Sequence, residues 1–311
     1  MEKKTKRRLI QPSTRALWQE ARRTPGYSLI DWLHGYVYAR WIYLYIGIGA
    51  GEHWLARLFG PPLRLLGRVL PHRSNGDSPS HTIADGYHGK VVPLDAAIQL
   101  VTVQEDVSLG DLEQIIPYPV ARDLVLQNPD HITVLDCACR SVRPNHCEPV
   151  DVCMVIGEPF ASFVLEHHPL RSRAISSQET VAILTAEHER GHVHHAFFKD
   201  AMLGRFYAIC NCCSCCCGAM YAHQHGTPML ASSGYVAQVD ADLCAGCGEC
   251  ADDCPFGAIS VDNGYAVVDG AACMGCGVCV AHCPQEAITL VRDPARGIPL
   301  EIHELMVRAA K

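Results

Sequence analysis

The chain has 311 residues, of which 49% are hydrophobic and 19% charged, so a largely disordered protein is excluded and a packed core is expected. Its formal net charge of −7 argues against nucleic acid as the main partner, because binding phosphates requires a basic surface. The sequence has 18 cysteines, and its first residues lack the pattern of a secretory signal. We therefore expect a cytoplasmic protein whose thiols bind metal rather than form disulfides.

Charge is distributed unevenly along the chain. Residues 1–73 contain thirteen Lys or Arg, four Asp or Glu and all four tryptophans, whereas residues 234–311 contain eleven acidic and four basic side chains. The Ser, Gly and Pro residues at 71–80 are typical of a linker. We predict an α+β protein with a basic, aromatic N-terminal arm (1–73), a cysteine-rich mixed α/β domain (81–226), an acidic module (234–292) and a tail (293–311).

The aromatic stretch Tyr36–Gly51 is open to several interpretations. A strand-like run leads to three closely spaced glycines, but Glu52 occupies the third glycine position of a dinucleotide-binding fingerprint, which disfavours that function. The eleven uncharged residues from Trp41 to Gly51 are too few for a transmembrane helix, which needs ~20. Two options remain: peripheral contact of residues 27–59 with an anionic membrane surface, or packing on the middle domain or a partner subunit.

The middle domain has signals for both strands and helices. Runs rich in β-branched residues predict strands at 132–135 and 150–156, and an apolar run at 206–209 leads into Cys210. Ser176 and Glu179 form a capping-box pattern for a helix that ends near Arg190, where Gly191 provides a C-terminal glycine.

The cysteines of the acidic module form an internal repeat. The pattern C-x2-C-x2-C-x3-C-P occurs at residues 244–255 and again 29 residues later, at 273–284. Over about residues 235–292 the chain resembles the bacterial two-cluster [4Fe–4S] ferredoxins, in which three cysteines of one run and the fourth of the other hold each cluster. Structural zinc is the alternative for paired C-x-x-C motifs, and the doubled pattern disfavours it. The resemblance assigns Cys244, Cys247, Cys250 and Cys283 to cluster one, and Cys273, Cys276, Cys279 and Cys254 to cluster two.

Ten further cysteines lie upstream in two groups. The first contains Cys137, Cys139, Cys147 and Cys153, with Arg140 and Arg143 between them. It suits an iron–sulfur cluster or one zinc ion; free thiols, or ligands shared with the second group, are the alternatives. The second group has six thiols within eight residues: Cys210, Cys212, Cys213, Cys215, Cys216 and Cys217. These six cannot all reach one cluster from a regular helix or strand.

For the second group we expect at least one more cluster, which a cysteine of the first group would complete. One or two additional iron–sulfur clusters are therefore predicted for residues 137–217. A soft-metal trap and a redox-active dithiol pair are the alternatives.

The upstream motifs extend the resemblance. C-A-C-R at 137–140 and C-N-C-C-S-C-C-C at 210–217 are similar to segments that precede a two-cluster ferredoxin in uncharacterised 4Fe-4S binding proteins of anaerobic bacteria. This resemblance covers about residues 130–292. It implies redox chemistry and brings no assigned reaction.

Several histidines precede the second cysteine group. His194 and His195 are candidate iron ligands or proton donors, although surface or capping roles are the ordinary explanation for such residues. Residues 188–192 spell H-E-x-x-H, the pattern of zinc hydrolases. That function requires the helix to continue past His192, which the residues that follow do not favour.

Together these features predict a multi-cluster iron–sulfur protein that relays electrons between a low-potential donor and a partner oxidoreductase. The acidic module would steer docking onto a basic partner surface. One alternative is an iron–sulfur reductase whose active-site cluster lies within residues 137–217, with His194 or His195 supplying protons. Another is a thiol-based metal-trafficking protein. We expect a cytoplasmic location, with membrane association on the cytoplasmic face as an option.

Overall fold

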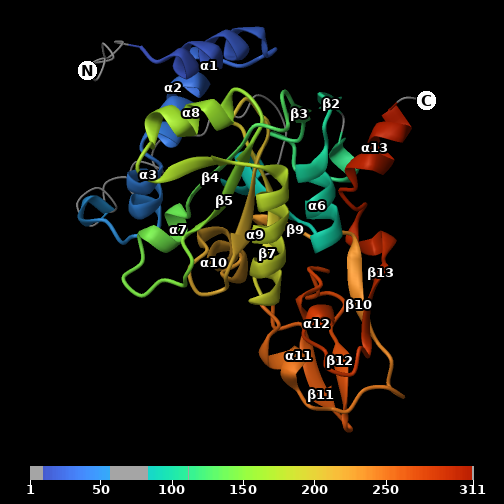
Figure 1. Cartoon of the computed structure of the whole chain (residues 1–311). Coiled ribbons are helices and arrows are strands. Elements are labelled where there is room, and N and C mark those ends of the chain that lie inside the picture. Colours follow the sequence, from blue (N-terminus) through green and yellow to red (C-terminus); the bar gives the residue numbers. More distant parts are fainter. Residues whose placement is uncertain (1–9, 57–82, 111, 310–311) are drawn as a thin grey trace, which may run out of the picture.

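The computed structural model describes residues 10–56, 83–110 and 112–309. The stretch 71–80, predicted as a linker, lies outside the described residues. The described chain forms a mixed α/β body with a smaller module that projects from one end (Figure 1).

A seven-stranded sheet forms the centre of the larger body. All its paired neighbours are antiparallel except β1 and β9, which run parallel. The strands predicted at 132–135 and 150–156 are confirmed as β4 and β5, and the run at 206–209 lies within β8. In spatial order the strands are β6 (Ser172–Ile175), β4 (Ile132–Asp136), β5 (Asp151–Ile156), β8 (Arg205–Cys212), β7 (Val193–Lys199), β1 (Tyr87–Val91) and β9 (Leu230–Ala231).

Helices cover both faces of this sheet. On one face, a core of aliphatic side chains packs beneath α6 (Leu94–Thr102), α9 (Ser177–Glu189) and the C-terminal α13 (Ile302–Ala309). The other face packs against α8 (Phe160–His167), α10 (Gly218–Gln224) and the N-terminal helices. Most of the upstream cysteines belong to this second core. Shorter elements are α5 (Ile83–Gly86), β2 (Val107–Leu109), η1 (Leu112–Gln114), β3 (Leu124–Leu126) and α7 (Ala138–Ser141).

The predicted helix after Ser176 is confirmed. The Ser176 hydroxyl accepts a hydrogen bond from the Glu179 amide at 3.1 Å, which satisfies one of the free amides of the first turn of α9. The helix ends at Glu189, and Gly191 has a positive φ of 77°. This conformation favours glycine and turns the chain toward β7.

The N-terminal arm is helical and packs on the sheet domain. It contains α1 (Pro12–Arg23), α2 (Leu29–Arg40) and α3 (Ile42–Gly49), so the strand-like interpretation of residues 36–51 is wrong. A short apolar run does not by itself distinguish a strand from a helix. The capping box of Ser28 and Asp31 stabilises the first turn of α2 and so favours the helix. Helices α1 and α2 pack on α8, and α3 packs on α7. The buried hydroxyls of Tyr38 and Tyr207 are 2.8 Å apart and join arm to sheet.

The outward side of the arm is apolar. Exposed side chains on and around α2 and α3 include Leu29, Ile30, Leu33, Val37, Trp41, Leu44 and Trp54. Among the described helices, none is both long enough and apolar enough to cross a bilayer.

The projecting module contains two short antiparallel sheets of two strands each and two one-turn helices. Strand β10 (Tyr235–Val239) pairs with β13 (Ile288–Arg292), and β11 (Ile259–Asp262) pairs with β12 (Tyr265–Val268). The helices are α11 (Glu249–Asp252) and α12 (Val278–Ala281). After β13 the chain passes through η2 (Pro294–Arg296) and returns to the larger body, where Ile302 of α13 is fully buried. The module is therefore held to the body at both of its ends.

Candidate metal centres

The eight cysteines of the projecting module gather around two separate hollows. Each hollow is lined by three cysteines of one motif and the last cysteine of the other, as in the sets that the ferredoxin resemblance assigns. The first hollow has Cys244, Cys247, Cys250 and Cys283; the second has Cys273, Cys276, Cys279 and Cys254. Hereafter they are called cradle one and cradle two.

Backbone amides support the sulfur atoms with the symmetry of the sequence repeat. Four backbone amides lie within 3.5 Å of a cysteine sulfur. The four bonds form two pairs, and within each pair the two donors are 29 residues apart and so are the two acceptors. Such N–H···S bonds stabilise thiolates and help set the potential of a bound cluster. The donors and acceptors are Ala237 to Cys273, Ala266 to Cys244, Ala258 to Cys254 and Ala287 to Cys283.

Glycine is required next to the sulfurs at two equivalent positions. Gly246 and Gly275 both have positive φ, at 65° and 64°. A Cβ at Gly246 would overlap the carbonyl of Gly264, and one at Gly275 would overlap the carbonyl of Tyr235. The close backbone approach is what wraps each C-x-x-C turn around its cradle.

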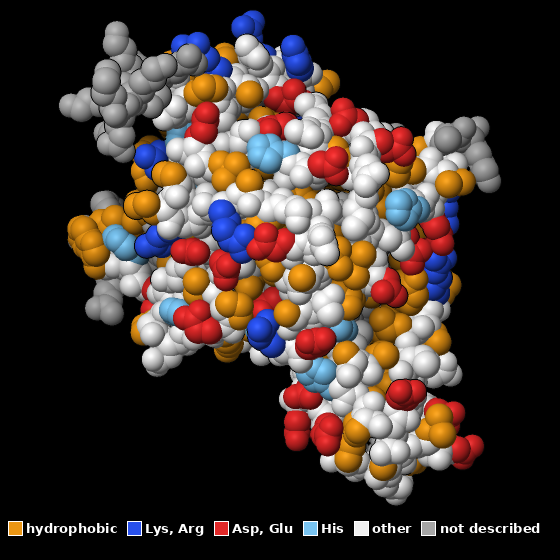
Figure 2. Space-filling view, viewed as in Figure 1, with side chains coloured by type: hydrophobic (Ala, Val, Ile, Leu, Met, Phe, Trp, Pro, Cys, Tyr) orange, Lys and Arg blue, Asp and Glu red, His pale blue; other side chains and the backbone are white. Residues whose placement is uncertain are grey.

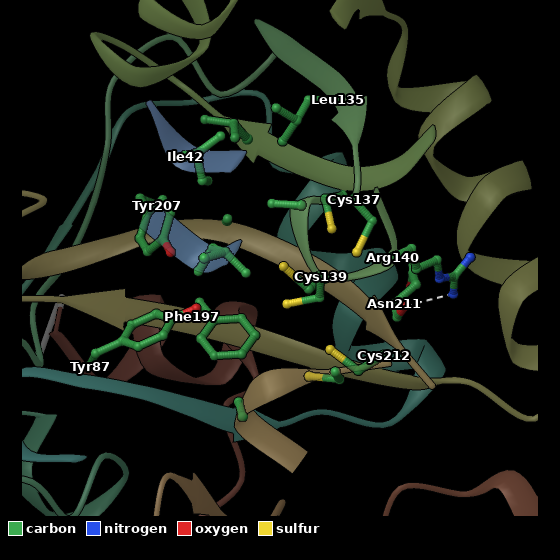
Figure 3. A pocket seen from close by; sticks show the side chains of 18 of the residues that line it. Ile42, Tyr87, Leu135, Cys137, Cys139, Arg140, Phe197, Tyr207, Asn211 and Cys212 are labelled. Carbon is green, nitrogen blue, oxygen red and sulfur yellow. Dashed lines mark hydrogen bonds between the residues drawn. The ribbon is translucent and has the colours of Figure 1, made fainter. Parts of the chain in front are cut away.

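The ten upstream cysteines divide into a group of six and a group of four. Six of them line one cavity: Cys137, Cys139, Cys153, Cys210, Cys212 and Cys217 (Figure 3). The cavity has a volume of about 70 Å³, against about 10 Å³ in each ferredoxin cradle. Cys213, which belongs to the group of four, also lines this cavity. We call this the six-thiol cavity.

Several elements supply these six thiols. Cys137 caps α7 and Cys139 lies within it, Cys153 comes from β5, and Cys217 caps α10. Cys210 and Cys212 alternate along β8, so both side chains lie on the same face of the sheet.

The six thiols form a continuous row of neighbours. Cys153 interacts with Cys210 and Cys137, and Cys217 interacts with Cys139 and Cys212. Hydrogen bonds from Cys139 and Cys153, together with the charge of Arg140, hold the pKa of Cys137 well below its usual range. The row therefore favours thiolate at its centre, which is the form that binds iron.

The far wall of the six-thiol cavity is aromatic. Tyr38, Tyr87, Phe197 and Tyr207 line it, and the Tyr87 and Phe197 rings stack with centroids 5.3 Å apart. Burial raises the pKa of both hydroxyls in the Tyr38–Tyr207 pair, so both stay protonated at neutral pH. These tyrosines were not predicted as site residues from the sequence. The tyrosine enrichment of residues 36–45 was the available signal, and its packing partner was not evident.

A buried ion pair lies beside the cavity. The side chains of Arg140 and Glu187 are each 1% exposed, and Arg140 Nη2 donates to Glu187 Oε2 at 2.8 Å. The same nitrogen donates to the carbonyl oxygen of Asn211 at 3.0 Å (Figure 3). The same guanidinium interacts electrostatically with Cys137 and Cys213. It therefore supplies positive charge to thiolates on the side away from the aromatic wall.

The other four cysteines are brought together at the edge of the body. The structure places Cys147 with Cys213, Cys215 and Cys216 rather than with the other cysteines of its sequence group, which agrees with the alternative that the two groups share ligands. The loop between α7 and β5 carries Cys147 away from the sheet and toward the turn between β8 and α10. Sequence spacing alone could not show this, since both loops are irregular.

The two candidate histidines lie on opposite faces of β7. His194 Nδ1 is 2.6 Å from Asn211 Oδ1, and its ring stacks on His188. His195 pairs in register with Cys210, and neither of its ring nitrogens has a partner among the described residues. Burial lowers the pKa of His194 to about 4 and that of His195 to about 3, so both are neutral at pH 7. Of the described residues, those that line the six-thiol cavity do not include either histidine.

The H-E-x-x-H pattern does not form the helix that a zinc hydrolase requires. Helix α9 ends at Glu189, and His192 lies beyond the turn at Gly191. His192 Nδ1 is 2.7 Å from Glu187 Oε2, whereas His188 stacks on His194. The pattern is therefore not presented on one helical face.

The paired four-cysteine cradles, with their amide-to-sulfur bonds and repeat symmetry, define an iron–sulfur domain of the two-cluster ferredoxin type in the C-terminal part of the chain. Residues 237–287 match the family model described as a 4Fe-4S dicluster domain. A probable ferredoxin of Methanosarcina thermophila is 59% identical over 32 residues, which are 10% of this chain and 55% of that protein. The chain thus spans about half the length of this curated relative. The dicluster domain implies two [4Fe–4S] clusters.

Proposed function

We propose that this protein relays single electrons through three iron–sulfur clusters, two in the ferredoxin cradles and a third in the six-thiol cavity. The ligands would be the four cysteines of each cradle and four of the six upstream thiols. A [4Fe–4S] cluster bound at such a site supplies one-electron transfer. The fit rests on the thiol set, on a cavity larger than either cradle, and on the buried Arg140 charge.

The observation that carries this proposal is the shared core between cradle two and the six-thiol cavity. Cys276 and the neighbouring Met274 and Val278 pack in the same buried apolar cluster as four cysteines of the cavity: Cys137, Cys153, Cys212 and Cys217. Phe256, which lines cradle two, also packs against this cluster and contacts the ring of His223 on α10. Continuous packed protein between the two sites favours electron transfer from one to the other.

Cradle one differs from cradle two in its surroundings. Its ligands do not join the shared core, and Cys247 is exposed, whereas Cys276 in cradle two is buried. Helix α12 of cradle two packs on α9, and His282 Nε2 is 3.1 Å from the carbonyl oxygen of Glu189. This arrangement supports one order of electron transfer: electrons enter at cradle one, pass through cradle two and reach the cluster in the six-thiol cavity.

Charge supports docking at the module. Residues 235–292 contain eight acidic side chains and one arginine, and Figure 2 shows the acidic groups gathered on the projecting module. The acidic residues are Asp240, Asp242, Glu249, Asp252, Asp253, Asp262, Asp269 and Glu286, all exposed. We propose a partner oxidoreductase with a basic surface, an association that added salt would weaken.

A second candidate function is reduction of a small molecule at the six-thiol cavity. Six thiols exceed the four that one cubane needs, and the protonated Tyr38 and Tyr207 hydroxyls lie in the cavity wall where they could donate protons. In this function the tyrosines take the role that the sequence suggested for His194 and His195.

Stopped-flow reduction by the methyl viologen radical tests the relay. Each radical gives up one electron, and the absorbance and EPR signals of the third cluster report its arrival. In Cys276→Ala, cradle two lacks a ligand, so reduction of the third cluster should slow by at least an order of magnitude. Cys215→Ala, which alters neither cradle two nor the six-thiol cavity, is the matched control and should keep the wild-type rate.

The same rate in Cys276→Ala as in the wild type would show that the third centre takes electrons directly, and would contradict the relay. A new EPR signal when a small substrate is added to the wild type would favour the reductase function.

A further inference from the structure

We propose that Cys147, Cys213, Cys215 and Cys216 bind a single zinc ion, separate from every iron–sulfur site. Their four sulfur atoms all lie within 4.8 Å of one another. Specific separations are 2.7 Å from Cys147 Sγ to Cys215 Sγ, 3.9 Å from Cys147 Sγ to Cys216 Sγ, and 3.5 Å from Cys215 Sγ to Cys216 Sγ. No other group of three or more Cys, His, Asp or Glu ligand atoms is this compact in the part of the chain that the structure describes.

With all four sulfurs within 4.8 Å of one another, the group is too compact for a cubane. The separations of 3.5 and 3.9 Å are close to those around one metal ion, and the 2.7 Å separation of Cys147 and Cys215 is shorter. Four thiolates at a Zn–S distance of ~2.3 Å in a tetrahedron stand ~3.8 Å apart. In a cubane each thiolate binds a different iron atom, so the sulfurs stand farther apart. The structure provides an internal comparison, because the four cysteines of each ferredoxin cradle do not form such a compact group.

The donor set also selects the metal. Four cysteines without an open position are the ligands of structural zinc sites. A tetrahedral set of four sulfurs otherwise selects iron, as a single ion or in a cluster. Arg140, which interacts with Cys213, would offset part of the net negative charge that four thiolates leave around a divalent ion.

The ion would fasten two loops over the six-thiol cavity. Cys147 lies in the loop between α7 and β5, and the other three cysteines lie in the turn between β8 and α10. Cys213 also borders the cavity, and the adjacent Cys212 and Cys217 line it. A zinc ion at this place would join the two loops beside the cavity without using any of the six thiols of the row. The run of six cysteines would then serve two centres, with Cys213, Cys215 and Cys216 on the ion and Cys210, Cys212 and Cys217 in the cavity.

Metal analysis of the anaerobically purified full-length protein tests this site. We expect about one zinc per chain in the wild type. Cys215→Ser should lose the zinc and keep the wild-type iron content, since Cys215 is exposed and lies outside the other sites. Ser214→Ala, a change in the same turn that removes no thiol, is the matched control and should keep the zinc.

A second measurement does not depend on any variant folding. X-ray absorption at the zinc edge of the wild type should show four sulfur neighbours at ~2.3 Å and no nitrogen or oxygen neighbour. Zinc with mixed nitrogen and oxygen neighbours, or an absence of zinc, would overturn the proposal. Loss of iron in Cys215→Ser, or a disulfide between Cys147 and Cys215 in peptide mass spectra, would also overturn it.

Discussion

The triple variant Cys137→Ser, Cys153→Ser and Cys210→Ser should lose about four of about twelve iron atoms per chain, the content of one cubane. Three changes are needed because the six-thiol cavity holds two thiols more than a cubane requires, and the remaining ones could replace a single lost ligand. After the triple change only Cys139, Cys212 and Cys217 remain in the row, and the further lining thiol, Cys213, belongs to the compact group with Cys147, Cys215 and Cys216. Three thiols are too few for a cluster held by four cysteines. Iron and sulfide analysis, with EPR of the reduced protein, measures the loss.

The chain offers a matched control for this variant. Cys147→Ser, Cys215→Ser and Cys216→Ser also removes three thiols, but these belong to the compact group of four and do not line the six-thiol cavity. This control should keep the wild-type iron content. The signals of the two ferredoxin clusters should persist in both variants, because cradles one and two are unchanged. Equal iron contents in the two triple variants would contradict a cluster in the six-thiol cavity.

Arg140→Met should lower the free energy of unfolding by about 3 kcal/mol, because it removes the buried arginine that pairs with Glu187 and leaves the half-exposed Arg190 as the remaining arginine partner of that carboxylate. The two side chains are each 1% exposed, so water cannot solvate the carboxylate of Glu187 in the variant. Urea unfolding of the holoprotein under anaerobic conditions, followed by tryptophan fluorescence, measures the change.

A nearby arginine provides the comparison. Arg143 pairs with Glu52 at the surface, where both partners are partly exposed, so Arg143→Met should cost no more than about 1 kcal/mol. Adding Glu187→Gln to Arg140→Met should recover part of the loss, since the buried charge is then removed as well. Equal effects of the two single arginine variants would show that Arg140 is not the buried counter-charge described here.

Much of the fold could be predicted because its signals are local. The capping pattern of Ser176 and Glu179 predicts the start of α9, and the β-branched run at 132–135 predicts β4. The repeat at 244–255 and 273–284 contains its own ligands, turns and glycines, so a short stretch of sequence predicts the whole module. The N-terminal helices were not predicted, because an apolar run such as residues 41–49 is compatible with the hydrophobic pattern of a helix and with that of a strand.

The upstream centres could not be predicted in the same way because they are assembled from distant elements. The six-thiol cavity requires the pairing of β4, β5 and β8, and the division of the cysteine run depends on which loop reaches each sulfur. One signal was available: Cys210 and Cys212 alternate with period two in a strand, which places both on one face. Tyr38 reaches the cavity only through packing of α2, which no local pattern shows.

The count of iron, acid-labile sulfide and zinc in anaerobically purified wild-type protein tests the central claim most directly. Three [4Fe–4S] clusters and one tetrathiolate zinc predict about twelve iron, about twelve sulfide and about one zinc per chain. About eight iron with equal sulfide would mean that only the two ferredoxin cradles bind clusters, and would contradict the third cluster in the six-thiol cavity.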